Sequence, residues 1–214
     1  LSLRKYKPAL WRAQVNDYSL AGLQGRELRN LTVGILGTGK IGAAVIKNLS
    51  GFGCRILASD IRENPSLKGL CTYVDNETLY KECDILSLHM PLLDSTRHFV
   101  NAETIARMKD GVTIINCARG ELMNIPDMIR GIETQKIGAL ALDVFDKEDG
   151  IYHENRRDDI ISNRDMAYLR QFPNVIMTQH MAFYTDAAVQ SMVFCGIEGL
   201  CDFAKTGHTE TELV

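Results

Sequence analysis

Three polar side chains that could bind a small acid and react with it each follow an apolar segment typical of a buried strand. Arg119, Glu148 and His180 each come a few residues after a short apolar, β-branched segment. In open parallel sheets, ligands lie at the carboxyl ends of the strands. Each residue taken singly is typical of an ordinary surface or structural position, but their joint placement at one sheet edge favours a site.

These three residue types together can carry out one coherent reaction. The guanidinium of Arg119 can bind a carboxylate through two parallel hydrogen bonds. The imidazole of His180 can exchange a proton with a hydroxyl or carbonyl oxygen near neutral pH. The carboxylate of Glu148, bonded to the other ring nitrogen, would orient the ring and favour its charged form. Beside a nicotinamide, they would form a hydride-transfer site for a 2-hydroxy acid.

A glycine-rich loop supplies the expected place for that nicotinamide cofactor. The run Gly37-Thr38-Gly39-Lys40-Ile41-Gly42 follows a predicted strand and opens a predicted helix, and Asp60 ends the next strand. In this pattern the glycines allow a tight turn, close approach of a pyrophosphate and close helix packing. Asp60 can accept hydrogen bonds from the ribose hydroxyls, which favours NAD over NADP, although Arg62 leaves the preference open. The alternative is a glycine-rich turn without a ligand.

The elements that position these residues alternate between strand and helix. Buried strands are expected at 32–36, 55–58, 84–88, 112–115, 137–144 and 175–177, and helices at 40–52, 76–81, 102–108, after Asn124 and at 185–205. In the helix at 40–52, the apolar positions are Ile41, Val45, Leu49 and Phe52. Strict alternation predicts an α/β fold with a doubly wound parallel sheet, a Rossmann-type NAD-binding domain. Residues 150–165 are expected to form a polar, irregular insertion.

Composition narrows the classes of partner. The chain of 214 residues has 24 Lys+Arg against 27 Asp+Glu, for a net charge of −3, and no basic block, so nucleic acid is not an expected partner. The longest apolar stretches are about six residues, against the ~20 needed to span a bilayer, so no membrane segment is expected. Six cysteines without a CxxC pair favour a reduced, cytoplasmic protein without metal.

The sequence resembles the D-isomer-specific 2-hydroxyacid dehydrogenases, particularly the D-lactate dehydrogenase branch. The matching segments are VGILGTGKIG, DILSLHMP, MKDGVTIINCARGEL, KIGALALDV and NVIMTQHMAFYT, in the order and spacing of that family. The resemblance implies an NAD-dependent enzyme in which His180 is the acid/base, Glu148 its carboxylate partner and Arg119 the residue that orients the substrate. It also implies that Phe183 touches the substrate side chain.

The same resemblance implies a set of cofactor contacts. Those expected to contact or border NAD are Gly37, Gly39, Lys40, Ile41, Gly42, Asp60, Met90, Pro91, Thr96, Cys117, Ala118 and Asp143. Two departures stand out: Gln179 replaces the usual proline before the histidine, and Met123-Asn124 replaces an aliphatic–Asp pair. Neither removes a group that the reaction needs.

The resemblance also predicts how the chain is organised. Residues 1–30 are expected to form a helix and connection that can act as a dimer arm, and residues 31–184 the NAD-binding domain. Residues 185–214 are expected to form a C-terminal helix that returns to a substrate lobe mostly absent from this sequence. In the arm, Tyr6, Leu10, Trp11 and Tyr18 can bury area between two chains or within one. Both readings stay open, as does activity of the fragment alone.

The expected reaction interconverts a 2-oxo acid and a D-2-hydroxy acid, most simply pyruvate and D-lactate. Larger acids, branched-chain ones or 2-hydroxyglutarate, are alternatives because much of the substrate pocket would lie on the absent lobe. A module that binds NAD(H) and regulates a partner without turnover is the alternative from another class. The joint presence of Arg119, Glu148 and His180 argues against it.

Overall fold

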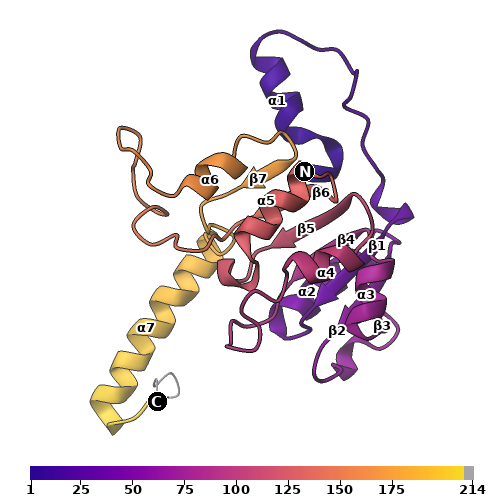
Figure 1. Cartoon of the computed structure of the whole chain (residues 1–214). Helices are drawn as coiled ribbons and strands as arrows, with labels where there is room; N and C mark the ends of the chain where they lie inside the picture. The colour runs from indigo at the N-terminus through magenta and orange to yellow at the C-terminus, as the bar shows by residue number, and fades with distance from the viewer. Residues whose placement is uncertain (210–214) are drawn as a thin grey trace. The chain divides into compact units, whose positions relative to one another are not determined.

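A computed structural model describes residues 1–209 and divides the chain into two compact units, Leu1–Gln179 and His180–Val214. The first unit contains a seven-stranded sheet in the order β3-β2-β1-β4-β5-β6-β7 (Figure 1). Every pair of neighbouring strands runs parallel. The predicted α/β fold with a doubly wound parallel sheet is therefore confirmed.

The strands lie close to their predicted positions. They are β1 (Thr32–Leu36), β2 (Arg55–Ser59), β3 (Thr72–Tyr73), β4 (Ile85–Leu88), β5 (Val112–Asn116), β6 (Ile137–Leu142) and β7 (Val175–Met177). All four residues of β4 are buried, as expected for a parallel strand that is covered on both faces. The two-residue strand β3 was not expected, because so short a pairing leaves no periodic pattern in the sequence.

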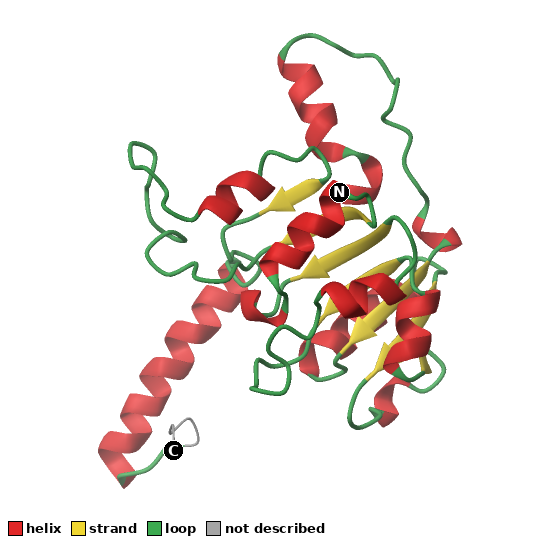
Figure 2. Cartoon of the chain, viewed as in Figure 1, coloured by secondary structure: helices red, strands yellow, loops and turns green. Residues whose placement is uncertain are grey.

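Helices α2 to α6 lie between successive strands, whereas α1 precedes the sheet and α7 follows it (Figure 2). They are α1 (Tyr6–Gln14), α2 (Lys40–Ser50), α3 (Asn76–Glu82), α4 (Ala102–Arg107), α5 (Ile125–Glu133), α6 (Arg164–Leu169) and α7 (Asp186–Thr206), with short 3-10 turns η1 (Ser2–Arg4), η2 (Leu28–Asn30), η3 (Pro65–Leu67) and η4 (Gly120–Leu122). Asn124 caps α5 by accepting a hydrogen bond from Asp127 N, as predicted. Helix α6 was not predicted; it begins inside the segment expected to be irregular.

The strand order reverses between β1 and β4. From β1 the chain runs outward through α2 to β2 and β3, then returns through α3 to β4 on the other side of β1. Because parallel crossovers are right-handed, this reversal places α2 and α3 on opposite faces of the sheet. The carboxyl ends of β1 and β4 therefore flank the crevice where such sheets bind ligands.

The predicted packing face of α2 is partly wrong. The helix ends at Ser50, and its buried residues are Gly42, Ala43 and Ile46. Ile41 and Phe52, which were expected to lie on its buried apolar face, are 69% and 59% exposed. The close approach of Gly42 to the glycine loop sets which side of the helix meets the sheet, and Ile41 is turned away from it.

Helix α1 is tied to the first unit by a lysine. Lys7 Nζ donates to the carbonyl oxygens of Arg170, Phe172 and Val175 at 2.5, 2.7 and 3.0 Å. Its ammonium also lies 4.9 Å from the ring centre of Trp11. Lys7 thus joins α1 to the segment between the end of α6 and the start of β7.

Helix α7 makes up most of the described second unit. It has 21 residues, and by length and composition alone it would be able to cross a membrane, unlike the expectation from apolar run lengths. A single such helix is weak evidence for a membrane span, because a core helix of a soluble protein or a signal sequence passes the same test. Thr185 caps its N-terminus through Ala188 N, and Gly207 ends it in the left-handed conformation.

Candidate active site

The glycine loop after β1 has the geometry that a bound pyrophosphate requires. Gly37 has a φ of 92°, and a Cβ there would lie 2.7 Å from the carbonyl of His89. A Cβ on Gly42 would lie 2.0 Å from the oxygen of Gly37. A Cβ on Gly39 would meet no described atom within 4 Å. The first and third glycines are thus required by the protein's own packing, whereas the second leaves space for a ligand.

Helix α2 begins directly at that space. Gly39 is its N-cap residue, and no described side chain caps it. The first N–H groups of an 11-residue helix, with the positive end of its dipole, therefore lie beside the loop. The residues present fit the pyrophosphate of a dinucleotide.

Asp60, at the end of β2, is bonded to the same loop. Its Oδ2 accepts hydrogen bonds from Thr38 N at 2.5 Å and Thr38 Oγ1 at 3.0 Å, and its Oδ1 accepts from Arg62 N at 3.2 Å. Partial burial acts to raise the pKa of this carboxyl, but the hydrogen bonds outweigh it and leave the pKa below its ordinary value. Asp60 is therefore a carboxylate at neutral pH, exposed beside the glycine loop.

The turn that carries Arg119 is held by a buried asparagine. Asn116, the last residue of β5, donates from Nδ2 to Arg119 O at 2.7 Å and accepts at Oδ1 from Ala118 N at 3.0 Å. The Arg119 side chain is exposed and donates to Ala118 O at 2.7 Å. Our sequence reasoning did not single out Asn116, although an asparagine at the end of an apolar strand is a typical turn-former.

Gly120 brings the Arg119 turn against the loop that carries Glu148. A Cβ on Gly120 would lie 2.1 Å from the carbonyl carbon of Phe145 and 2.4 Å from Asp146 N. In that second loop, Phe145 N donates to Glu148 Oε2 at 2.7 Å. The backbones of the two loops are thus in direct contact, so the structure brings together the segments that carry Arg119 and Glu148.

Asp143 ties the ends of three strands together. Its backbone N donates to Asn116 O at 3.0 Å, and its Oδ1 accepts from Thr178 Oγ1 at 2.5 Å. Thr178 N in turn donates to Leu142 O at 2.9 Å. Asp143 is buried, and burial together with Asp143 raises the pKa of the nearby Cys117 thiol. The chain that leads to His180 therefore leaves the sheet next to the Arg119 turn.

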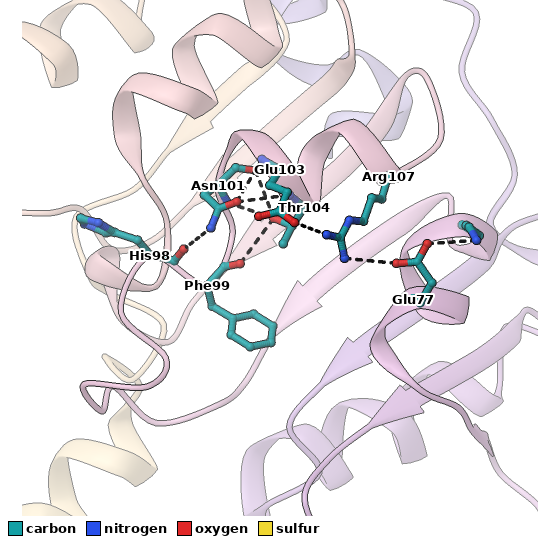
Figure 3. Close-up of polar contacts among 8 residues, drawn as sticks. Glu77, His98, Phe99, Asn101, Glu103, Thr104 and Arg107 are labelled. Atoms are coloured by element: carbon teal, nitrogen blue, oxygen red, sulfur yellow. Dashed lines mark hydrogen bonds and ion pairs between the residues drawn. The ribbon is translucent and has the colours of Figure 1, made fainter.

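The loop after β4 is closed by Thr96. Its hydroxyl donates to Pro91 O at 2.7 Å and accepts from Leu93 N at 2.8 Å. Just beyond, Asn101 caps α4 and donates from Nδ2 to His98 O at 3.0 Å, while Arg107 pairs with Glu103 and Glu77 (Figure 3). This loop, which carries Met90, Pro91 and Thr96, is thereby held at both ends.

Backbone hydrogen bonds connect the same loop to the Arg119 turn. His98 N donates to Glu121 O at 2.8 Å, and Val100 N donates to Leu122 O at 3.0 Å. Asn124 N then donates to Val100 O at 2.9 Å. The predicted cofactor loop and the predicted substrate-binding turn form one connected edge of the first unit.

His180 and Phe183 belong to the second unit. The backbone of His180 has a φ of 51°, a left-handed conformation that is uncommon for residues other than glycine and often marks a functional position. Its ring packs edge-on against Phe183, with ring centres 6.3 Å apart and an angle of 82°. The pairing of His180 with Glu148 stays a prediction.

A second histidine, missed as a functional candidate, lies under the glycine loop. Ser87 Oγ and His89 Nε2 are 2.9 Å apart, and burial lowers the pKa of His89. Its backbone forms the surface against which Gly37 packs. His89 therefore supports the loop as a neutral side chain; its position directly after a buried strand was the available signal.

A wide cavity borders the loop that carries Glu148, on the side of the polar insertion. It has a volume of about 1140 Å³ and is lined mainly by residues 145–165, together with His98 and the start of α5. Its charged lining alternates in sign, with Lys147, Arg156 and Arg164 against Asp146, Asp149, Asp159 and Asp165. It lacks the single-sign character that would select an anionic cofactor.

Comparisons with known proteins agree with this geometry. The family model of the D-isomer specific 2-hydroxyacid dehydrogenase, NAD binding domain, matches residues 2–182. An aromatic 2-oxoacid reductase of Clostridium sporogenes is 43% identical over 212 residues, which are 99% of this chain and 64% of that protein. D-lactate dehydrogenase kk1H of Curvularia clavata is 38% identical over 211 residues, 99% of this chain and 61% of that protein.

Solved structures give the same result. A D-lactate dehydrogenase from Sporolactobacillus sp. superposes with a TM-score of 0.93 at 34% identity, over 99% of this chain and 64% of that one. The NAD-complexed D-isomer specific 2-hydroxyacid dehydrogenase of Lactobacillus delbrueckii ssp. bulgaricus gives 0.88 at 32% identity, over 98% and 65%. The chain thus spans about 64% of the length of its first relatives. Together with the glycine loop and Asp60, this places the chain in the family of D-isomer specific 2-hydroxyacid dehydrogenases, whose NAD-binding domain it carries.

Proposed function

We propose that the chain is part of an NAD-dependent dehydrogenase that reduces a 2-oxo acid to a D-2-hydroxy acid. The observation that carries the proposal is the contact of Gly120 with Phe145 and Asp146, which joins the Arg119 and Glu148 loops at the sheet edge that follows the glycine loop. A module that only binds nucleotide needs no such arrangement of a guanidinium and a carboxylate. The relatives' names support the reaction class.

In this proposal each residue has one task. NADH, when bound, supplies the hydride to the carbonyl carbon of the substrate. Arg119 binds the substrate carboxylate through its planar fork, His180 gives a proton to the carbonyl oxygen, and Glu148 orients His180. Phe183 touches the substrate side chain.

The cofactor contacts are proposed for the residues gathered at the edge described above. Gly37, Gly39 and Gly42 would approach the pyrophosphate, and Lys40, Ile41 and Asp60 would contact the adenosine half of NAD. The exposure of Ile41 at the first turn of α2 supports a contact there. The cofactor cleft would be lined by Met90, Pro91 and Thr96. The nicotinamide end would be bordered by Cys117, Ala118 and Arg119, with Asp143 near its carboxamide.

Two substrates are favoured for different reasons. Pyruvate is the first candidate substrate, because several relatives of the chain are named D-lactate dehydrogenases. An aromatic 2-oxo acid is the second candidate, because the aromatic 2-oxoacid reductase is more similar, at 43% identity against 38%. Branched-chain 2-oxo acids and 2-oxoglutarate are further members of the panel to be tested.

Three wider proposals accompany this function. Residues 31–184 would form the NAD-binding domain and 185–214 a segment that packs on a substrate lobe. Residues 1–30 would serve as an arm between two copies of the protein. The enzyme would act in the cytoplasm on small 2-oxo and 2-hydroxy acids, with no nucleic acid or membrane as partner.

The test is NADH oxidation by the full-length protein with pyruvate, phenylpyruvate, 2-oxoisocaproate and 2-oxoglutarate. We expect turnover with at least one acid, and His180→Ala should lower kcat by about two to four orders of magnitude, the usual scale for a general acid. His153→Ala, in the polar insertion, is the matched control and should leave kcat unchanged. Binding of NADH without turnover of any acid would favour the regulatory module instead.

A further inference from the structure

A chain of hydrogen bonds runs beneath the glycine loop and ends on Asp60. Asn64 N donates to Tyr73 Oη at 2.8 Å, and Tyr73 Oη donates to Thr38 Oγ1 at 3.0 Å. Thr38 Oγ1 then donates to Asp60 Oδ2 at 3.0 Å, and Thr38 N donates to the same oxygen at 2.5 Å. Asn64 Nδ2 donates to Thr38 O at 3.1 Å, which holds the loop residue from its other side.

The direction of this chain is fixed by its two ends. A backbone N–H can only donate, so the Tyr73 oxygen accepts from Asn64 and its own proton is directed to Thr38. A carboxylate can only accept, so the Thr38 proton is directed to Asp60. Each hydroxyl thus accepts one hydrogen bond and donates another, an arrangement in which neighbouring bonds strengthen each other.

The two oxygens of Asp60 are consequently not equivalent. Oδ2 receives two hydrogen bonds from Thr38, whereas Oδ1 receives one from Arg62 N. Because a carboxylate oxygen accepts about two hydrogen bonds, Oδ1 retains capacity for a ribose hydroxyl and Oδ2 is committed to the protein. Thr38 is only 2% exposed, so its hydroxyl serves the loop and not a ligand.

We infer that Thr38, Tyr73 and Asn64 are positioning residues for NAD, which hold Asp60 and the glycine loop as one preformed unit. The ribose and the pyrophosphate then bind to a carboxylate and a loop that are already ordered, so that the free-energy cost of ordering the loop on binding is smaller. Asp60 is a structural anchor of the loop as well as a ribose ligand. Replacing it to admit NADP would therefore weaken the binding of both cofactors.

The first test removes the Thr38 hydroxyl without changing its shape. Thr38→Val retains the backbone N–H bond to Asp60 but loses the side-chain bond, and Thr38→Ser retains both. In a fluorescence titration of the chain, Thr38→Val should raise the Kd for NADH about tenfold, as expected for a lost hydrogen bond to a charged group. Thr38→Ser should stay within about twofold of the unmodified chain.

The second test asks whether Tyr73 acts through Thr38. Tyr73→Phe should raise the Kd for NADH about threefold in the unmodified chain and no further in a Thr38→Val background, because coupled residues are not additive. Tyr168→Phe is the matched control. Its hydroxyl also donates a hydrogen bond, to Glu133 Oε1 at 2.8 Å, but on the exposed surface between α6 and α5, and its loss should leave the Kd unchanged.

A third measurement needs no cofactor. In a carbon-detected NMR titration, Thr38→Val should raise the pKa of the Asp60 carboxyl toward its ordinary value, and Thr38→Ser should not. Folded variants that bind NADH with equal Kd would overturn the inference and leave the dehydrogenase proposal intact. Normal NADH binding with no turnover of any 2-oxo acid by the full-length protein would instead overturn the dehydrogenase proposal alone.

Discussion

Gly120 is the residue at which the two proposed catalytic loops touch. A Cβ there would lie 2.1 Å from a carbonyl carbon of the backbone, so it cannot be accommodated by a side-chain rotation. Gly120→Ala should therefore push the Arg119 turn away from the Glu148 loop and cost about 1–3 kcal/mol of stability, as overpacking usually does. Substrate binding should suffer more than cofactor binding, with KM for the 2-oxo acid raised at least tenfold, since about 1.4 kcal/mol corresponds to that factor.

The matched control is Gly51→Ala. Gly51 follows α2 with a φ of −69°, and an added Cβ would meet only Asn48 O, at an ordinary 3.7 Å. Alanine there should leave KM unchanged. Equal kinetics for Gly120→Ala and the unmodified full-length enzyme would show that the contact between the two loops has no part in substrate binding.

The contacts of single residues were the least predictable part of the site. The candidate residues Arg119, Glu148 and the glycines could be proposed from the sequence because their types and spacing follow predicted strands. Asn116 and Thr38 could not, because their importance lies in which backbone atoms come near them after folding. A buried polar side chain next to a strand end indicates that it holds a loop, but the sequence does not show which backbone atoms it contacts.

Asp84 joins several elements at the amino edge of the sheet. Its Oδ2 accepts from Thr32 N at 2.9 Å, and its Oδ1 lies 3.3 Å from both Arg26 and Lys109. Partial burial acts to raise the pKa of Asp84, but the hydrogen bonds from Thr32 and Arg26 and the charge of Lys109 outweigh it, so the pKa is lowered. A carboxyl with a lowered folded-state pKa stabilises the fold fully above its unfolded pKa of about 4 and loses that contribution as the pH falls further.

Asp84→Asn should therefore lower the Tm most at pH 7 and least in acid. We expect a loss of about 1–2 kcal/mol at neutral pH, the scale of a charge-assisted hydrogen bond. The difference in Tm between the two proteins should shrink as the pH is lowered from 4 toward the folded-state pKa. Asp110→Asn removes a carboxylate that is 91% exposed and should change the Tm little at any pH. A constant difference in Tm across this range would contradict the role of ionised Asp84.

Elements were predictable where a repeating pattern existed. Buried strands such as β1 and β4 are apolar on both faces and bounded by polar residues, so their positions followed from the sequence. The packing face of α2 did not, because Gly42 contributes no apolar side chain to a periodic pattern, yet it lies so close to Gly37 that a Cβ would be 2.0 Å from the Gly37 carbonyl oxygen. Strand β3, with two residues, is too short to repeat a period, and the start of helix α6 falls inside a polar segment whose composition predicts no regular structure.

At the scale of the whole molecule, the amino-terminal segment is both attached and exposed. Lys7 fixes α1 to the first unit through three carbonyl groups, yet Tyr6, Leu10 and Trp11 remain nearly half exposed and Tyr18 is 75% exposed. The segment can therefore be attached to its own chain and also contact a second chain, because its apolar side chains stay exposed after the Lys7 hydrogen bonds have formed. Apolar surface gathered on a short segment of this kind commonly marks an interface.

If this segment joins two copies, Tyr18→Asp should weaken the dimer by placing a charge where apolar area is buried. In sedimentation velocity, the unmodified protein should form a dimer, and Tyr18→Asp should raise the dimer Kd at least tenfold, a modest effect for a buried unpaired charge. Ile160→Asp, at a position 98% exposed in the insertion, is the matched control and should leave the dimer unchanged. Because neither Tyr18 nor Ile160 is among the proposed cofactor contacts, NADH affinity should be the same in both variants, which separates lost association from lost folding. If the protein stays monomeric at every concentration, the segment packs only on its own chain, where Lys7 holds it.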